Sequence, residues 1–190
     1  MKYSIILLVL IFYVTAFAGE WHVDKSKKNS AVYESDAAVL TFEGATDKLD
    51  GFVFWEGETL FESNTKIYFE VDLNTLDSGI GKRDSDMREI LNTNKWGFAT
   101  FEGAVDSFEY PTEDKNEISV VLSGKFFVNG VHKEMKVPGK IIKSAEGIKI
   151  ESDFSIFLND YNVEAPSLLA FVKVSEEIKL NLDFHMKIIN

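Results

Sequence analysis

The residues whose types and spacing most suggest a functional site are an arginine and an aspartate that are adjacent in the sequence, Arg83 and Asp84. They follow a flexible segment with two glycines, residues 78–81, and precede a short helical pattern. Such a pair can clamp a polar group at the mouth of a pocket. It can also be structural, with the arginine on nearby carbonyl or carboxylate oxygens and the aspartate as a helix cap or a partner across the loop. We expect the structural role and keep the clamp as the alternative.

Other kinds of reactive site find little support in the sequence. The three histidines, His22, His132 and His185, lie far apart at polar positions of separate expected strands, which does not predict a metal site. The chain has no cysteine, no G-x-S-x-G motif and no glycine motif for phosphates or dinucleotides. We therefore expect a non-catalytic protein without metal or cofactor. An enzyme acting on a lipid is the weakest alternative, with Asp160, Tyr161 and Arg83 as its only candidate residues.

A short helix is expected directly after the arginine–aspartate pair. Asp86 and Glu89 have the spacing of a capping box, and Met87, Ile90 and Leu91 then fall on one helical face. Two asparagines and a glycine follow closely and favour a stop. Because the pattern interrupts a sequence that otherwise alternates like β-strands, we expect this helix to act as a lid or plug at one end of the fold.

The rest of the chain has the period of β-strands. The alternation of apolar and polar residues is cleanest at 66–73 and 178–188, and Asn129–Gly130 between two strand patterns predicts a hairpin. Further strands are expected near 21–23, 31–43, 49–61, 99–108 and 148–158, and a helical turn near 166–169. The pattern predicts an all-β antiparallel barrel of about eight strands with one short helix inserted between strands, because closure removes exposed edges. An open sandwich is the alternative.

The N-terminus predicts export. Lys2 precedes an apolar run, and Ala16–Phe17–Ala18 has the small-x-small pattern of a signal-peptidase site, so we expect residues 1–18 to be a signal peptide cut between Ala18 and Gly19. The apolar run is shorter than the ~20 residues that a spanning helix needs, although an uncleaved anchor is the alternative. Residues 19–190 then form one domain in the periplasm or outside the cell.

The net charge and the aromatic content of the chain limit the kinds of molecule that it is expected to bind. A net charge of −11 argues against nucleic acids and anionic lipid surfaces as partners, because like charges repel. The chain has 16 Phe, 3 Trp and 6 Tyr, enough to fill a core without disulfides. An eight-stranded barrel is just wide enough either to be filled by side chains or to hold one slender ligand. A carrier of an apolar molecule and a barrel with a solid core are both compatible with this content.

Several motifs follow one another along the chain. They are Trp21-x-Val23-Asp24-x-Ser26, IYFEVDLNTLDSG at 67–79, Arg83-Asp84 with Met87-Arg88, GKFFVNGVHKEMKVPG at 124–139 and FSIFLNDYNVEAP at 154–166 with its Asp160-Tyr161. In this order they resemble the YceI-like family of bacterial exported proteins, and the resemblance covers nearly all of the expected mature chain. The chain departs from the family near Lys27–Ser30, where members often carry Ser-His, and at 95–99, where members usually read "dFFd".

This resemblance implies a periplasmic, lipocalin-like barrel whose apolar tunnel binds a polyisoprenoid, a quinone tail or another long-chain lipid. The alternative is an exported stress-related or structural barrel that has a solid core and acts through protein partners. The sequence leaves the ligand's identity and the oligomeric state, a homodimer included, open. We expect structural roles for Arg83, Asp84, Asp160 and Tyr161. The expected tunnel-lining residues are Phe52, Phe54, Phe69, Val71, Met87, Leu91, Phe101, Phe126, Phe154, Ile156, Leu182 and Phe184.

Overall fold

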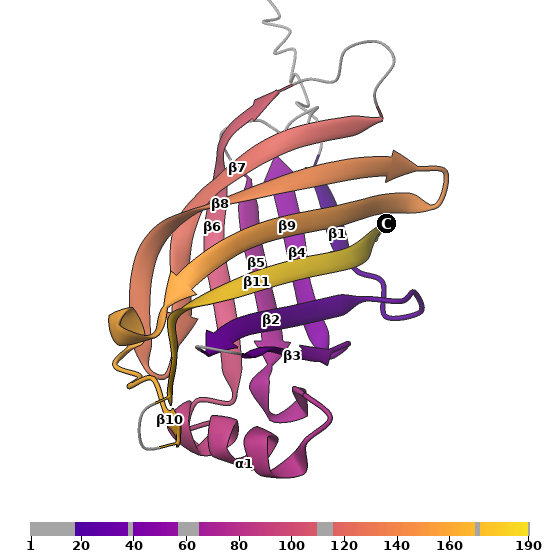
Figure 1. The fold of residues 1–190 in the computed structure, drawn as a ribbon. Coiled ribbons are helices and arrows are strands. Elements are labelled where there is room, and N and C mark those ends of the chain that lie inside the picture. The colour runs from indigo at the N-terminus through magenta and orange to yellow at the C-terminus, as the bar shows by residue number, and fades with distance from the viewer. Residues whose placement is uncertain (1–17, 38–39, 57–64, 110–115, 170–171, 190) are drawn as a thin grey trace, which may run out of the picture.

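The structure is a computed structural model that describes residues 18–37, 40–56, 65–109, 116–169 and 172–189 (Figure 1). Residues 1–17 of the predicted signal peptide and the end of the strand predicted at 49–61 lie outside these ranges. Within the ranges, no helix combines the length and apolarity that crossing a membrane would require.

Antiparallel strands make up most of the described chain. The helical segments are η1 (Leu73–Thr75), α1 (Gly81–Ile90) and η2 (Leu158–Tyr161). The strands are β1 (Ala18–Val23), β2 (Ser30–Ala37), β3 (Leu40–Thr46), β4 (Leu49–Glu56), β5 (Lys66–Asp72), β6 (Phe98–Glu109), β7 (Glu117–Val128), β8 (Val131–Ser144), β9 (Gly147–Phe157), β10 (Ser167–Leu169) and β11 (Val172–Ile188).

Eight of these strands close into a barrel in the order β1-β4-β5-β6-β7-β8-β9-β11, with β1 pairing to β11. The barrel closes through the long strand β11. One edge of it pairs with β9, and the other pairs first with β2 along 174–183 and then with β1 along 186–188. The β2–β3 hairpin therefore continues the wall beside β1, and α1 lies across the end of the barrel next to that hairpin (Figure 1). The predicted all-β barrel with one short helix between strands is confirmed.

Two local predictions are wrong. The single strand expected at 31–43 is the hairpin of β2 and β3, in which Ala37 pairs with Leu40. The sequence between 31 and 43 contains no glycine, proline or asparagine that would predict a turn. The helical turn expected near 166–169 is the short strand β10, because Ser167 pairs with Lys173 of β11. In both places, pairing with a distant strand decides the local conformation.

The helix begins earlier than its expected capping box. α1 starts at Gly81, and Ile80 at its N-cap makes no side-chain cap hydrogen bond. Asp86 lies inside the helix and pairs with Lys82 one turn before it, so it is not the cap. The expected stop is confirmed, since Leu91 is the C-cap and Asn92 has a left-handed φ of 53°.

A polar network fixes the connection between β1 and β2. Asp24 is only 7% exposed, and it accepts hydrogen bonds from Ser26 N at 3.1 Å, Ser26 Oγ at 2.8 Å and Lys187 Nζ at 3.2 Å. The Asn29 amide links the Asp24 carbonyl to the backbone N–H of His185. The network holds the start of β2 against β11, where the two strands jointly form part of the barrel wall.

We expect Asp24 to make stability depend on acidic pH. The hydrogen bonds from Ser26, then the nearby Lys187, lower the pKa of Asp24 to about 2 from an ordinary value of 3.8. A carboxylate with a lowered folded-state pKa stabilises above its unfolded pKa, and this contribution is lost as pH falls from about 4 towards 2. Urea unfolding at pH 7 and at pH 3 should show that Asp24→Asn reduces the difference between the two midpoints. An unchanged difference would contradict the assignment.

Gly51 allows β4 to lie close to β5. Its φ is 154°, and a Cβ at this position would overlap the carbonyl oxygen of Tyr68. Gly51→Ala should therefore cost about 1–3 kcal/mol of unfolding free energy through backbone strain, with steric overlap adding to it. Gly139→Ala is the matched control, because its Cβ would come no nearer than 3.4 Å to its surroundings. Equal urea midpoints for the two variants would show that the Gly51 conformation is not required.

Candidate binding cavity

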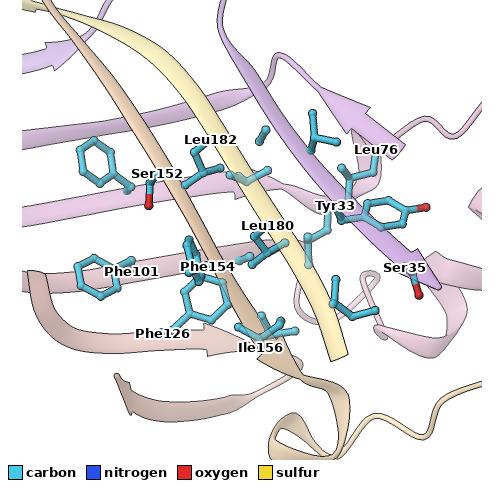
Figure 2. Close-up of a pocket in the computed structure, with 18 of the residues that line it drawn as sticks. Tyr33, Ser35, Leu76, Phe101, Phe126, Ser152, Phe154, Ile156, Leu180 and Leu182 are labelled. Atoms are coloured by element: carbon cyan, nitrogen blue, oxygen red, sulfur yellow. The ribbon is translucent and has the colours of Figure 1, made fainter. Parts of the chain in front are cut away.

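The barrel encloses a cavity of about 590 Å³. Its wall is formed by inward-facing side chains of the barrel strands, together with β2, β3 and α1, and is mostly apolar (Figure 2). Leu122, Phe154 and Leu180 lie inside the barrel and are still only half-buried, because part of each side chain faces this open space. The interior is therefore partly hollow, which does not fit the alternative of a solid core.

One end of the cavity is lined by α1 and reaches the protein surface. Met87 and Ile90 of α1 and its C-cap Leu91 line it from the helix side, as the spacing of these residues predicted. Leu40 and Ile80 also line it, and each is 54% exposed. The cavity wall therefore reaches the protein surface between the start of β3 and the start of α1. The helix and the hairpin together frame an opening there.

The arginine–aspartate pair holds the loop that precedes α1. Asp84 is 7% exposed, and its carboxylate accepts hydrogen bonds from Ser78 N at 3.0 Å and from Ser78 Oγ. Arg83 donates through Nε to Ser78 Oγ at 2.8 Å and through Nη2 to the Ser78 carbonyl at 2.7 Å. The Ser78 hydroxyl is the main reason that the pKa of Asp84 is lowered from its ordinary value. Both contacts agree with the structural role expected from the sequence.

Arg83 has a second contact, at the opening. Its guanidinium lies 4.9 Å from the centre of the Phe42 ring, and both side chains line the cavity. A cation over an aromatic face contributes about 0.5–1 kcal/mol at exposed sites. The contact joins α1 to β3, so the same arginine that fixes the loop also fixes one rim of the opening.

Asp160 and Tyr161 form part of η2 and are not joined to Arg83 by their hydrogen bonds. Asp160 pairs with Lys133 Nζ at 3.1 Å on the surface, and the Tyr161 carbonyl accepts from Asn129 Nδ2 at 3.1 Å. Tyr161 is 3% exposed, lines the cavity and packs edge-on against Phe126. Burial, then the neighbouring Asp160, raises the pKa of Tyr161 to about 12. These contacts connect η2 to the hairpin of β7 and β8.

Ten of the twelve expected tunnel-lining residues do line the cavity, and whether they touch a ligand stays a prediction. The ten are Phe69, Val71, Met87, Leu91, Phe101, Phe126, Phe154, Ile156, Leu182 and Phe184. Phe52 and Phe54 are a correction, because the wall of β4 is formed by Val53 between them and Phe52 stacks on Tyr68 outside the barrel. Gly51 interrupts the alternation of apolar and polar residues in this strand, so the sequence did not indicate which face points inward.

Other lining residues were missed by the sequence reasoning. Most belong to the same alternating faces of β7, β8, β9 and β11 and could have been found by extending the alternation: Leu122, Val137, Ile141, Ile148, Ile150, Ile178 and Leu180. Tyr33 and Ser35 of β2 gave no such indication, because the β2–β3 hairpin was expected to be one strand. In the described ranges, no group of three or more histidine, aspartate or glutamate side chains is placed to hold a metal ion.

Residues 21–186 match the profile of the YceI-like domain. Several solved structures share the fold. BcnA of Burkholderia cenocepacia has 18% identity and a TM-score of 0.66, and the match covers 88% of this chain and 99% of that one. A polyisoprenoid-binding domain of Saccharophagus degradans implicated in plant cell wall breakdown has 18% identity and a TM-score of 0.69, and the match covers 88% of this chain and 97% of that one. Identities this low establish a common fold alone. None of the curated proteins compared with the chain matches it.

Proposed function

Because the chain belongs to the YceI-like domain family, we propose that it is a non-catalytic carrier that holds a polyisoprenoid or another long-chain lipid inside its barrel. The observation that carries this proposal is the apolar cavity of about 590 Å³ enclosed by the barrel. Cavities of 300–1,000 Å³ are typical of sites for small molecules. A relative with the same fold is described as a polyisoprenoid-binding domain, which supports the same class of ligand.

Hydrocarbon burial supplies the affinity in this proposal. Each buried CH₂ group contributes about 0.8 kcal/mol, whereas association costs about 4–15 kcal/mol. Four isoprene units contain about 20 carbon atoms and so contribute roughly 16 kcal/mol by the same rule. A chain of this length can outweigh the cost with few polar contacts. Selectivity then follows from the length and shape of the cavity.

A direct binding experiment tests the carrier function. Purified, delipidated protein is titrated with geranylgeraniol, a C20 prenyl alcohol, by isothermal titration calorimetry. We expect saturable binding of one molecule per chain with a negative heat-capacity change, the mark of buried apolar surface. The absence of saturable binding would contradict the proposal.

We also propose that the chain is exported, with cleavage between Ala18 and Gly19. The observation behind this part is the N-terminal sequence, in which a charged residue, an apolar run and a small-x-small site follow one another. Intact-mass measurement of the protein from the periplasmic and culture fractions should give a chain that begins at Gly19. A chain that retains Met1 in the membrane fraction would contradict it.

A further inference from the structure

One polar side chain in the cavity wall has no hydrogen-bond partner. Ser35 of β2 lines the cavity and is only 2% exposed, and its Oγ finds no partner in the part of the chain that the structure describes. A buried hydroxyl without a partner lowers the stability of the fold, because it has lost its hydrogen bonds to water and forms none with the protein. Natural proteins rarely keep such a group without a use for it.

Several other polar groups of the wall already bind other groups of the protein. Ser152, the other buried serine of the wall, donates its hydroxyl to the Pro138 carbonyl at 2.6 Å. Arg83 is bound to Ser78, and Lys82 forms an ion pair with Asp86. Ser35 thus differs from Ser152 because its hydroxyl can still form a hydrogen bond with a ligand.

The position of Ser35 indicates which end of a ligand it would meet. In the hairpin, Ser35 stands directly opposite Phe42, the residue whose ring lies under Arg83 at the opening. On its other side it pairs with Ile178 of β11. Figure 2 shows Ser35 at one side of the cavity, with Phe101 and Phe126 at the other. A chain that reaches these phenylalanines can therefore have its end group beside Ser35.

From this placement we propose that Ser35 binds the uncharged oxygen of an amphiphilic chain, such as a long-chain alcohol or a carbonyl compound, whose hydrocarbon part fills the cavity. This inference rests on the proposed carrier function and adds the ligand's polar group to it. A serine hydroxyl can donate to a carbonyl and can both donate to and accept from an alcohol. An anionic end group fits less well, because one neutral hydroxyl does not compensate a buried charge. The two cations of the wall already have partners, Lys82 in Asp86 and Arg83 in Ser78.

Paired serine variants and paired probes test the proposal. The probes are geranylgeraniol, the C20 hydrocarbon that has a methyl group in place of its CH₂OH, and geranylgeranyl monophosphate, each titrated into the delipidated full chain. Ser35→Ala should weaken the binding of the alcohol about tenfold and leave the hydrocarbon unchanged. Ser30→Ala, a half-buried serine of the same strand β2 that does not line the cavity, is the matched control and should leave the affinity for both within twofold.

Melting temperatures give a second measure. Ser35→Ala should melt at the same temperature as the wild type or higher, because an unpaired buried hydroxyl is removed, whereas Ser152→Ala should melt lower because a hydrogen bond is lost.

Four outcomes would overturn the proposal. An equal effect of Ser35→Ala on alcohol and hydrocarbon, or no effect on either, would remove Ser35 as the polar contact while leaving the carrier function in place. Tighter binding of the monophosphate than of the alcohol would overturn the assignment of an uncharged group. If the wild type binds none of the three probes, the carrier function itself fails, and the inference about Ser35 fails with it.

Discussion

Leu122→Trp is expected to weaken the binding of long-chain lipid strongly while leaving the barrel folded. Leu122 of β7 faces the cavity and is half-buried there, so a larger side chain has open space to enter. In a densely packed core the same change would force neighbours apart and typically cost about 1–3 kcal/mol of stability. Leu180→Trp on β11 places a second, independent obstruction in the same space.

The size of the expected effect follows from the hydrocarbon that the indole displaces. Exclusion of one five-carbon isoprene unit removes roughly 4 kcal/mol of binding free energy at about 0.8 kcal/mol per carbon. This corresponds to a loss of affinity of roughly a thousandfold. Calorimetric titration with geranylgeraniol measures it, and circular dichroism during heating shows whether the variant is folded.

Val121→Trp is the matched control for Leu122→Trp. Val121 is the adjacent residue of the same strand, is also half-buried, and points away from the cavity. The control should bind geranylgeraniol as the wild type does. Wild-type affinity in both Leu122→Trp and Leu180→Trp would show that the ligand does not occupy the cavity.

Asp84→Ala is expected to lower stability strongly before it affects ligand binding. The carboxylate is buried and accepts two hydrogen bonds from Ser78, one from the backbone N–H and one from the hydroxyl. Hydrogen bonds to charged groups contribute about 1.5–3 kcal/mol each, and the partners left behind lose their acceptor, so we expect a loss of roughly 2–4 kcal/mol. At about 2–4 °C per kcal/mol in a chain of this size, the melting temperature should fall by roughly 5–15 °C.

The same carboxylate adds a pH dependence of known sign. Because the Ser78 hydrogen bonds lower the folded-state pKa of Asp84, its contribution to stability is complete above the ordinary aspartate pKa and is lost as pH falls through the lowered value. Melting curves at pH 7 and pH 3 should therefore show a smaller difference between wild type and Asp84→Ala at pH 3.

Asp86→Ala is the control for this prediction. Asp86 belongs to the same helix and makes an exposed ion pair with Lys82, and such exposed pairs contribute little to stability, so the melting temperature of Asp86→Ala should stay close to that of the wild type. An unchanged melting temperature for Asp84→Ala together with lost lipid binding would contradict the structural role and favour the alternative, in which Arg83 and Asp84 clamp the ligand.

Strands with a clean alternation could be predicted in detail. In β5 and β11 each apolar residue follows a polar one, so the sequence alone predicts that Phe69, Val71, Leu182 and Phe184 share one face, and all four line the cavity. The register of these strands is unambiguous because a shift by one residue would turn the whole apolar set outward. The position of the helix between β5 and β6 was likewise predicted from its change of period.

Prediction failed where a distant contact decides the local structure. Phe52 and Phe54 look as suitable for an interior as Val53, and only the pairing of β4 with β1 and β5 settles which of them faces inward. The start of α1 at Gly81 precedes the capping-box spacing, and its N-cap Ile80 has no side chain that could mark a helix start in the sequence.

The cavity itself could not have been predicted from periodicity. An inward-facing Leu180 has the same sequence pattern whether its neighbour across the barrel touches it or not. The unpaired hydroxyl of Ser35 was equally hidden, since it depends on the β2–β3 hairpin and on its pairing with β11.

The most direct test of the carrier function is to identify what the protein carries when it is purified from its own cell compartment. Organic extraction of the wild type, followed by mass spectrometry, should release a long-chain apolar molecule in close to equimolar amount. The same extraction of Leu122→Trp should release little of it, and Val121→Trp should release the wild-type amount. Repeated absence of any such molecule from the wild type, or an equal amount from Leu122→Trp, would contradict the account.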